Sequence, residues 1–217
     1  MARSCKVIAV IPAYNEEKTI KLIVNSLLIH VDVVVVNDGS TDKTSEEVLS
    51  TKAILLNNQH NMGYEWTIDI GFQYAFNNGY THVVTIDADG QHKPELINEI
   101  LVLIENGSDL IIGNRDNLPR FSEKLFSFYT QYKYGISDPC SGLKAYSTSI
   151  YKERGYFDSY RSSGTELFLF GVYKGYSFAS FNYLVLPRED ASRFGGLFKA
   201  NFRIFRALLK AIWGAYK

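Results

Sequence analysis

The sequence predicts an α/β domain built on a mostly parallel central sheet with helices on both faces. In the first half of the chain, short apolar runs rich in β-branched residues alternate with segments of helical spacing. The run at residues 31–37 is apolar almost throughout, as expected of a strand that is buried on both faces. This alternation favours parallel strands joined by helical crossovers. Ligands bind such sheets at the carboxyl ends of the strands.

The first half of the chain is expected to alternate regularly between strand and helix. Strands are expected where β-branched and other apolar residues run together, and helices where apolar residues recur every three or four positions. Ile20, Val24 and Leu27 follow helical spacing, and Pro94 suits the first turn of a helix that runs to Glu105. The predicted order is strand 7–11, helix 17–28, strand 31–37, helix 44–50, strand 53–56, helix 66–77, strand 82–87, helix 94–105 and strand 110–113.

Beyond Asp116 the pattern changes and aromatic residues accumulate. Residues 121–134 and 163–174 are expected to be helices, a loop is expected at 138–142, and residues 182–187 are expected to form the last strand. The chain contains 15 tyrosines and 14 phenylalanines. Their concentration in the second half suggests that this half handles something apolar or ring-shaped.

The composition is that of a folded globular protein with one domain, or one domain with an appendage. Hydrophobic residues make up 46% and charged residues 21% of the 217 residues. Because the formal net charge is zero, no overall field favours nucleic acid, and no nucleic-acid partner is expected. The two cysteines, Cys5 and Cys140, lack metal-ligand spacing and fit a reducing compartment. No apolar run reaches the ~18 residues of a membrane span, and no targeting peptide is expected.

Two carboxylates follow the strand predicted to end at Asp87. Asp87 and Asp89 are two positions apart, and because side chains alternate along an extended strand, they are expected to point to the same side. Mg²⁺ and Mn²⁺ prefer oxygen ligands of this kind. A metal held there would neutralise the diphosphate of a nucleotide-sugar. The alternative is that both aspartates cap turns or the next helix.

Two further turns at strand ends carry polar residues. The turn at 37–42 contains Asp38 and Gly39, which suit either a helix cap or a contact with a base or ribose. The turn at 12–16 contains Tyr14, whose ring is not needed for capping and suits stacking on a base. The sequence has neither the glycine pattern of dinucleotide-binding folds nor a P-loop, so neither chemistry is indicated.

Several of these motifs occur together in one order, and the combination resembles a known family. The segments at 11–16, 36–42, 61–63 and 87–92 together resemble family 2 glycosyltransferases of the GT-A fold. The segments at 113–115 and 138–144 resemble the branch that includes dolichyl-phosphate mannose synthase and bacterial polyprenyl-phosphate glycosyltransferases. The resemblance covers roughly residues 6–190. We therefore expect a GT-A domain over residues 1–195 and an amphipathic basic and aromatic helix over 196–217.

The resemblance implies roles for individual residues. Pro12, Tyr14, Glu16 and Asp38 would hold the nucleotide, with Gly39 beside them. Asp87, Asp89 and Gln91 would surround the metal and the donor phosphates, and Asp89 is the expected main metal ligand. Arg115 would lie near the phosphates or the acceptor. The remaining residues expected to bind substrate are Asp138, Ser141 and Arg193.

The acceptor is inferred from what the sequence lacks. A sugar hydroxyl needs a general base during attack, whereas a phosphate monoester is already anionic at neutral pH. The Glu-Asp pair that often supplies this base is not found, and Glu166, at the start of a predicted helix, is the nearest candidate, with helix-end electrostatics as its alternative role. A phosphate acceptor needs cations instead, because arginine matches phosphate oxygens in bidentate fashion. The candidates are Arg115, Arg120, Arg188 and Arg193.

The pattern of apolar and basic residues over 198–217 predicts an amphipathic helix. On a helical wheel one broad face is apolar and aromatic, and a narrow basic stripe lies beside it. Such a helix suits a membrane interface, where anionic lipids attract lysine and arginine by about 1 kcal/mol each. Two alternatives stay open: the helix packs its apolar face on the domain, or it binds a partner protein that spans the membrane. The basic stripe is Lys199, Arg203, Arg206, Lys210 and Lys217.

Together these observations predict a metal-dependent hexosyltransferase, and the resemblance implies that it is inverting. It would use a GDP- or UDP-linked sugar with Mg²⁺ or Mn²⁺ and transfer the hexose to a polyprenyl phosphate. We expect it in the cytoplasm, peripheral on the cytoplasmic membrane face. One alternative is a glycosyltransferase that acts on a sugar hydroxyl of a lipid-linked or surface glycan, with Asp138 or Glu166 as base. The other is a non-catalytic nucleotide-sugar-binding or membrane-scaffold protein.

Overall fold

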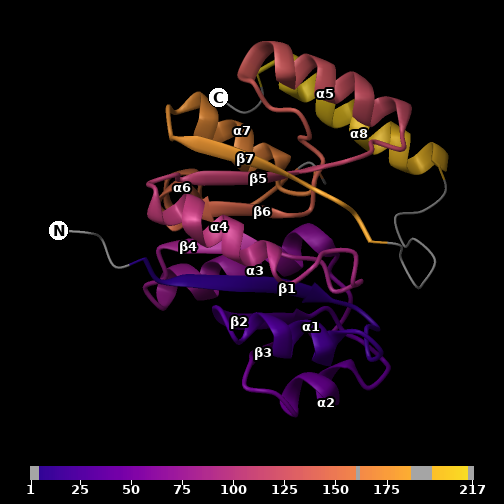
Figure 1. The fold of residues 1–217 in the computed structure, drawn as a ribbon. Helices are drawn as coiled ribbons and strands as arrows, with labels where there is room; N and C mark the ends of the chain where they lie inside the picture. Colours follow the sequence, from indigo (N-terminus) through magenta and orange to yellow (C-terminus); the bar gives the residue numbers. More distant parts are fainter. Residues whose placement is uncertain (1–4, 160–161, 187–196, 215–217) are drawn as a thin grey trace.

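A seven-stranded sheet covered by helices on both faces forms the centre of the molecule (Figure 1). The computed structural model describes residues 5–159, 162–186 and 197–214. Runs of β-branched residues form the strands, and amphipathic segments form the covering helices. The elements are β1 Val7–Ala13, α1 Ile20–Leu27, β2 Asp32–Asn37, α2 Thr44–Leu49, β3 Ile54–Asn57, α3 Tyr64–Asn77, β4 His82–Thr85, α4 Leu96–Glu105, β5 Leu110–Arg115, α5 Phe121–Tyr134, β6 Lys144–Ser147, α6 Thr148–Arg154, α7 Thr165–Tyr173, β7 Phe178–Tyr183 and α8 Leu197–Ile212.

The sheet has the order β3-β2-β1-β4-β6-β5-β7. β1 is parallel to both β2 and β4, and β5 is parallel to β7. β6 is antiparallel to β4 and to β5, so the sheet is mostly parallel with one reversed strand among the described residues. β6 lies between β4 and β5 and is antiparallel to both, so β5 runs in the same direction as β4. β5 and β7 therefore run in the same direction as β1. Their carboxyl ends therefore lie at the same edge as those of β1, β2 and β4.

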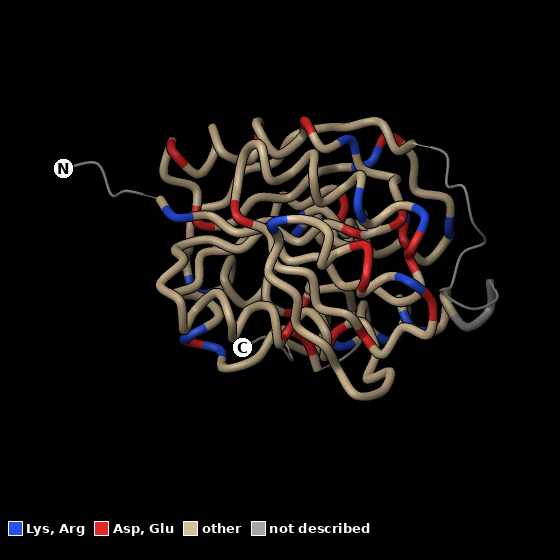
Figure 2. Tube along the Cα trace, turned by 90° about the horizontal axis from the view of Figure 1, so that it is seen from below, with Lys and Arg blue, Asp and Glu red and all other residues tan. Residues whose placement is uncertain are grey.

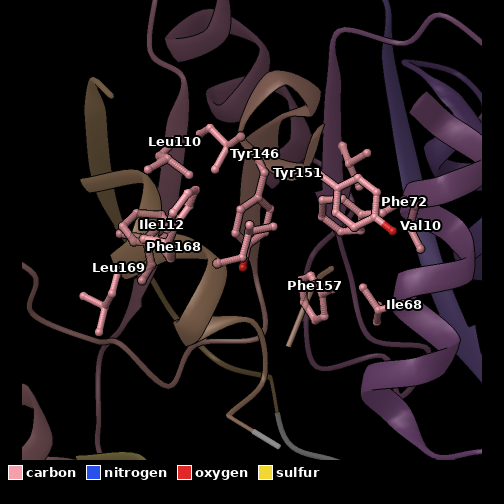
Figure 3. Close-up of a cluster of buried hydrophobic side chains, with 14 of the residues drawn as sticks. Val10, Ile68, Phe72, Leu110, Ile112, Tyr146, Tyr151, Phe157, Phe168 and Leu169 are labelled. Carbon is pink, nitrogen blue, oxygen red and sulfur yellow. The ribbon is translucent and has the colours of Figure 1, made fainter. Parts of the chain in front are cut away.

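The two faces of the sheet are buried in separate hydrophobic clusters. Alternate residues of β1 point to opposite faces, so that Val10 joins one cluster and Ile11 the other. α1, α2 and α4 cover one face, whereas α3 and α5 to α8 contribute to the other cluster. Figure 3 shows Phe72 of α3 among the aromatic residues of this second cluster, and its ring centroid lies 5.4 Å from that of Tyr146 and 5.0 Å from that of Phe157. These large buried rings fix the layer of helices on the sheet.

The predicted α/β class and parallel sheet are confirmed, and the predicted helices and strands of the first half are present with small shifts at their ends. β6 and α6 were not predicted. The last strand, predicted at 182–187, is instead β7 at Phe178–Tyr183. β7 lies at the edge of the sheet and is only partly buried, so its pattern is weak. The apolar run that suggested the strand continues past it, and Leu184 is exposed.

The final helix packs lengthwise on α5, and the two helices lie side by side at the end of the molecule near β5 and β7 (Figure 1). A stripe of α8 that includes Ile204, Leu208 and Ala211 is buried and belongs to the core. Ser122 Oγ donates a hydrogen bond of 2.6 Å to Asn201 Oδ1, which ties the starts of the two helices together. Among the described residues, no helix is long and apolar enough to cross a membrane.

Charge is distributed evenly over the chain. Figure 2 shows lysines and arginines interspersed with aspartates and glutamates along the tube, in agreement with the formal net charge of zero. A mixed charge pattern produces no strong field of one sign.

Candidate active site

A large cavity opens at the carboxyl edge of the sheet, where the fold places the ends of several parallel strands. Its volume is about 1240 Å³. It is lined by the segments that follow β1, β2, β4 and β5, by the end of β7, and by one side each of α5 and α8. The predicted site residues that line it are Pro12, Tyr14, Glu16, Asp38, Asp87, Asp89, Gln91 and Arg115.

Hydrogen bonds join the turn after β1 to the turn after β2. The main-chain N–H of Asn15 donates to Ser40 Oγ at 2.9 Å, and the main-chain N–H of Thr41 donates to Asn15 Oδ1 at 2.8 Å. Asn15 has a φ of 54°, a conformation that asparagine tolerates better than most residues. The neighbouring Tyr14 lines the cavity with 36% of its surface exposed. The two turns are therefore joined to each other, and Tyr14 lies on the side that faces the cavity.

Asp38 is buried and organises the loop that forms the next part of the wall. Its carboxylate accepts hydrogen bonds from Asn58 Nδ2 at 2.9 Å and from the amides of Met62 at 2.8 Å and Gly63 at 2.9 Å. Gly39 follows with a φ of +72°, and a Cβ there would lie 2.8 Å from the His60 carbonyl carbon. Gly39 does not line the cavity and acts here as the turn residue that lets this loop approach.

The Asp-Ala-Asp segment lies just beyond β4, which ends at Thr85 rather than at the predicted residue 87. Asp87 Oδ1 accepts a hydrogen bond of 3.1 Å from the Tyr64 hydroxyl, and the other oxygen lies against Gly142, where a Cβ would be only 2.5 Å from it. The main-chain N–H of Gln91 donates to Asp89 Oδ1 at 3.1 Å. Both carboxylates face the same cavity, although they project from a turn rather than from a strand.

The chemistry of these donors fits a hard divalent cation. Asp87 and Asp89 provide carboxylate oxygens, and Gln91 provides an amide oxygen, in one cavity wall. Among the described residues there is no group of three acidic, histidine or cysteine side chains placed to hold a metal. Mg²⁺ is commonly bound by one or two carboxylates together with substrate phosphates and water, so this set suits a metal that arrives with a diphosphate.

Another part of the cavity lining is supported by a buried network of charges. Arg115 donates to Asp138 through Nε at 2.7 Å and Nη2 at 2.9 Å, and its Nη1 lies 3.5 Å from Glu123 Oε1. Arg120 contacts the same Glu123 oxygen at 2.8 Å. Burial alone would lower the pKa of Arg115, but the hydrogen bond and charge of Asp138 raise the pKa above its ordinary value. Arg115 is thus locked in its charged form at the cavity wall.

A buried lysine at the start of β6 holds the loop that carries Asp138 through hydrogen bonds to main-chain carbonyl groups. Lys144 Nζ donates to the carbonyl oxygens of Ser141 at 2.6 Å and Ser163 at 2.9 Å. Burial lowers the pKa of Lys144 to about 8. The Leu143 amide donates to Ser141 Oγ at 3.2 Å, so Ser141 shapes the loop and does not line the cavity. Asp138 likewise lies behind the wall, with its side chain directed to Arg115.

Glu166, the predicted base, lies away from the cavity. Its carboxylate is fully buried and is bonded to Arg154 Nη2 at 2.6 Å, to the Tyr156 hydroxyl at 3.0 Å and to the Ser159 amide at 2.7 Å. These partners anchor the start of α7, and this geometry does not support a role as base. Arg188 and Arg193 lie outside the described residues.

Four of the cavity residues that were not predicted as site residues carry polar or charged side chains that bear on the site. Tyr64 positions Asp87, and Glu123 holds both arginines. His92 lines the cavity, with its Nε2 3.1 Å from the Tyr183 hydroxyl. Burial raises the pKa of Tyr183 to about 12. The fourth is Arg203 of α8. His92 lies three positions after Asp89 and was open to prediction, whereas Tyr64, Glu123 and Arg203 belong to helices whose packing no local pattern gives.

Comparison with known proteins shows which family the chain is similar to. The family model for glycosyl transferase family 2 matches residues 8–181. A UDP-N-acetylglucosamine–dolichyl-phosphate N-acetylglucosaminyltransferase from Methanococcus voltae is 32% identical over 66% of this chain and 70% of its own length. A polyprenol monophosphomannose synthase from Mycolicibacterium smegmatis is 28% identical over 67% of this chain and 63% of its own length. The chain thus spans about two thirds of these relatives.

Among solved structures, one similar in fold is glucosyl-3-phosphoglycerate synthase from Mycobacterium tuberculosis, crystallised with Mn²⁺, UDP and glucosyl-3-phosphoglycerate. It superposes with a TM-score of 0.73 at 18% identity and covers 96% of this chain and 80% of the synthase. At this identity the likeness concerns the fold. With the family match and the geometry of the cavity, it leads to one conclusion: the chain belongs to glycosyltransferase family 2 and has the GT-A fold.

Proposed function

We propose that this protein is an inverting glycosyltransferase that moves a hexose from a nucleoside-diphosphate sugar to a polyprenyl phosphate at the cytoplasmic face of a membrane. One observation carries the proposal: a single cavity is lined both by Asp87, Asp89 and Gln91 and by Arg115, Arg120 and Arg203, and residues of α5 and α8, two helices with exposed aromatic side chains, also line it. The names of the relatives, which include dolichyl-phosphate and polyprenol glycosyltransferases, support the same acceptor class.

The donor would occupy the wall formed by the first four strands. Tyr14 offers a ring for the base, and the Asp38-ordered loop borders the same space. Asp87, Asp89 and Gln91 would hold Mg²⁺ or Mn²⁺. The metal, when bound, stabilises the negative charge of the leaving diphosphate. The Mn²⁺ and UDP of the structural neighbour support this arrangement. The nucleotide of the donor would be GDP or UDP.

The acceptor is proposed from the state of the two predicted bases. Asp138 is 2% exposed and is engaged by both ends of the Arg115 fork, and Glu166 is fully buried at the start of α7. Neither carboxylate is placed to take a proton from a sugar hydroxyl in the cavity. A phosphate monoester needs no such base, and the arginine wall would offset its repulsion from the donor diphosphate.

A membrane surface would lie against α5 and α8. Phe121, Phe128 and Tyr132 are 79%, 75% and 89% exposed and follow one stripe of α5. On the neighbouring α8, Phe202 is 71% and the nearby Trp213 is 81% exposed. Exposed aromatic rings on adjacent helices suit the headgroup region of a bilayer. In this arrangement α8 both packs on the domain through its buried stripe and presents its outer side to lipid.

A transfer assay tests the proposed function. Full-length protein with Mn²⁺ is incubated with labelled GDP-mannose, UDP-glucose or UDP-N-acetylglucosamine and either undecaprenyl phosphate or a sugar-terminated lipid. We expect one donor to give a labelled lipid phosphate, and Asp89→Ala to abolish transfer. Transfer to the sugar-terminated lipid alone would instead support a hydroxyl acceptor. Metal-dependent nucleotide binding without any transfer would support a non-catalytic binding protein.

Liposome flotation tests the membrane surface separately. The double variant Phe128→Ser, Trp213→Ser is expected to float less well than the wild-type chain with vesicles that contain anionic lipid. Leu22→Ser is the matched control, because Leu22 is 74% exposed on α1, away from the α5 and α8 pair. Equal flotation of the double variant and the control would contradict the membrane assignment.

A further inference from the structure

We propose that Arg203 of α8 binds the phosphate group of the acceptor, so that the last helix completes the active site. The inference rests on the proposed function, because it requires a phosphate acceptor. It assigns to α8 a role in substrate binding in addition to any contact with lipid.

The first argument is the availability of the cavity's cations. Among the described residues, the lysine and arginine side chains that line the cavity are Arg115, Arg120 and Arg203. Arg115 is held by Asp138 and Glu123, and Arg120 by Glu123. Arg203 has no ion pair or hydrogen bond within the part of the chain that the structure describes. Within the described part of the chain, Arg203 is therefore the cavity guanidinium whose donors are left for an incoming anion.

The second argument is that α8 is held firmly enough to position this side chain. Asn201 is bonded to Ser122 of α5 at 2.6 Å, and the Tyr129 hydroxyl donates to the Ala211 carbonyl at 3.2 Å. Ile204, next to Arg203, is buried in the core and also lines the cavity. A guanidinium on a helix fixed at both ends loses less freedom on binding an anion than one on a loop.

The third argument is the distance from the apolar surface. Phe202 and Phe205, on either side of Arg203, are 71% and 44% exposed. The three residues lie within one helical turn, which rises about 5.4 Å. In a polyprenyl phosphate the charged head and the apolar chain are directly joined. Arg203 can therefore hold the head in the cavity while the chain stays among the exposed aromatic residues.

The chemistry expected of this contact is a charge-assisted hydrogen bond, bidentate where the phosphate presents two oxygens. Such a bond to a charged group changes affinity by about 10- to 100-fold. Arg203→Gln is therefore expected to raise the KM for farnesyl phosphate by about 10- to 100-fold with the KM for the donor unchanged. Arg203→Lys should recover part of the loss, since lysine keeps the charge but not the fork.

Arg206→Gln is the matched control, because Arg206 lies on the same helix, is exposed and does not line the cavity. Both variants remove one positive charge, so a general surface effect would change both equally. The assay uses detergent-dispersed farnesyl phosphate, and equilibrium binding of farnesyl phosphate, inorganic phosphate and farnesol is measured in parallel. Weaker binding of farnesyl phosphate and of inorganic phosphate by Arg203→Gln, with farnesol unaffected, would support a phosphate contact. Circular dichroism and Tm establish that each variant is folded.

An unchanged KM and binding constant for farnesyl phosphate in Arg203→Gln would overturn the inference, as would equal losses in Arg203→Gln and Arg206→Gln. The proposed function fails in a different way. If the wild-type chain binds farnesyl phosphate but transfers no sugar, the acceptor reaction is refuted, and the binding constants alone decide the role of Arg203. If the wild-type chain does not bind farnesyl phosphate, both are refuted.

Discussion

Replacing Asp138 by asparagine should reveal whether this residue is a structural partner of Arg115 or a catalytic base. The substitution keeps the shape of the side chain and removes its charge. Asp138 accepts three hydrogen bonds from Arg115, from Nε at 2.7 Å, Nη2 at 2.9 Å and the main-chain amide at 3.2 Å. Only 2% of the Asp138 side chain and 16% of the Arg115 side chain are exposed, so the pair is buried.

The expected loss follows from leaving a buried guanidinium poorly compensated. Removing one partner of a buried ion pair costs about 3–5 kcal/mol. Arg115 keeps its contact with Glu123 at 3.5 Å, which places the loss near the lower end, at about 3 kcal/mol. In a domain of this size each kcal/mol lowers Tm by about 2–4 °C, so a decrease of about 6–12 °C is expected.

Thermal and urea unfolding, followed by circular dichroism, measure this loss. Glu153→Gln is the control, because Glu153 pairs with Lys174 at 2.8 Å while both side chains are about 40% exposed. Tm of this control should stay within about 2 °C of the wild type, since exposed pairs contribute little. A stable Asp138→Asn protein with unchanged Tm and abolished transfer would refute the structural role and restore Asp138 as a base.

Two further predictions concern the same loop. Gly142→Ala should weaken binding of the nucleotide-sugar by about tenfold, because the new methyl group would lie 2.5 Å from an Asp87 oxygen; unchanged donor affinity would contradict this contact. Lys144→Met should remove a pH dependence of stability. The pKa of Lys144 is about 8 in the folded chain, below its ordinary 10.5. The unfolded chain therefore binds more protons between these values, and wild-type stability should rise with pH there, by at most about 1.4 kcal/mol per pH unit. Urea unfolding of both proteins at pH 7.5 and 9.5 measures the difference, and equal changes in the two would rule out this contribution.

The part of the cavity proposed to bind the donor is lined by Tyr14, Asp38 and Asp89 and is called here the donor wall. It could be predicted from the sequence because its residues follow strongly apolar strands. The β-branched runs of β1 and β2 give an unambiguous strand pattern, and the residues that follow must then lie at the carboxyl edge. Tyr14, Asp38 and Asp89 were placed at this edge in that way, and each lines the cavity. The detailed role of Asp38 was not predictable, because its partners Met62 and Gly63 come from a distant loop.

The part of the cavity proposed to bind the acceptor, which includes Arg115 and Arg203 and is called here the acceptor wall, was predicted less well. The reason is that its contacts depend on how distant segments pack. β6 is four residues long and contains a fully buried lysine, so no apolar run marks it as a strand. Glu166 was open to prediction as a base because its position at a helix start was visible, whereas its buried partners Arg154 and Ser159 were not. Contacts of this kind depend on tertiary packing, which local pattern does not encode.

The reversed strand explains why the two walls differ in this respect. A strand that runs against its neighbours begins at the edge of the sheet where those neighbours end. The start of β6 at Lys144 therefore pairs with Thr85 at the end of β4. The loop before β6 therefore enters at the carboxyl edge and brings Asp138 to Arg115 and Gly142 to Asp87. In the proposed function the donor side would be built from the ends of parallel strands, and the acceptor side would include the segment before the reversed strand and α8. Because these are separate segments of the chain, substitutions in residues 138–144 that spare Gly142, or on the cavity side of α8, should alter the choice of acceptor while the affinity for the donor is retained.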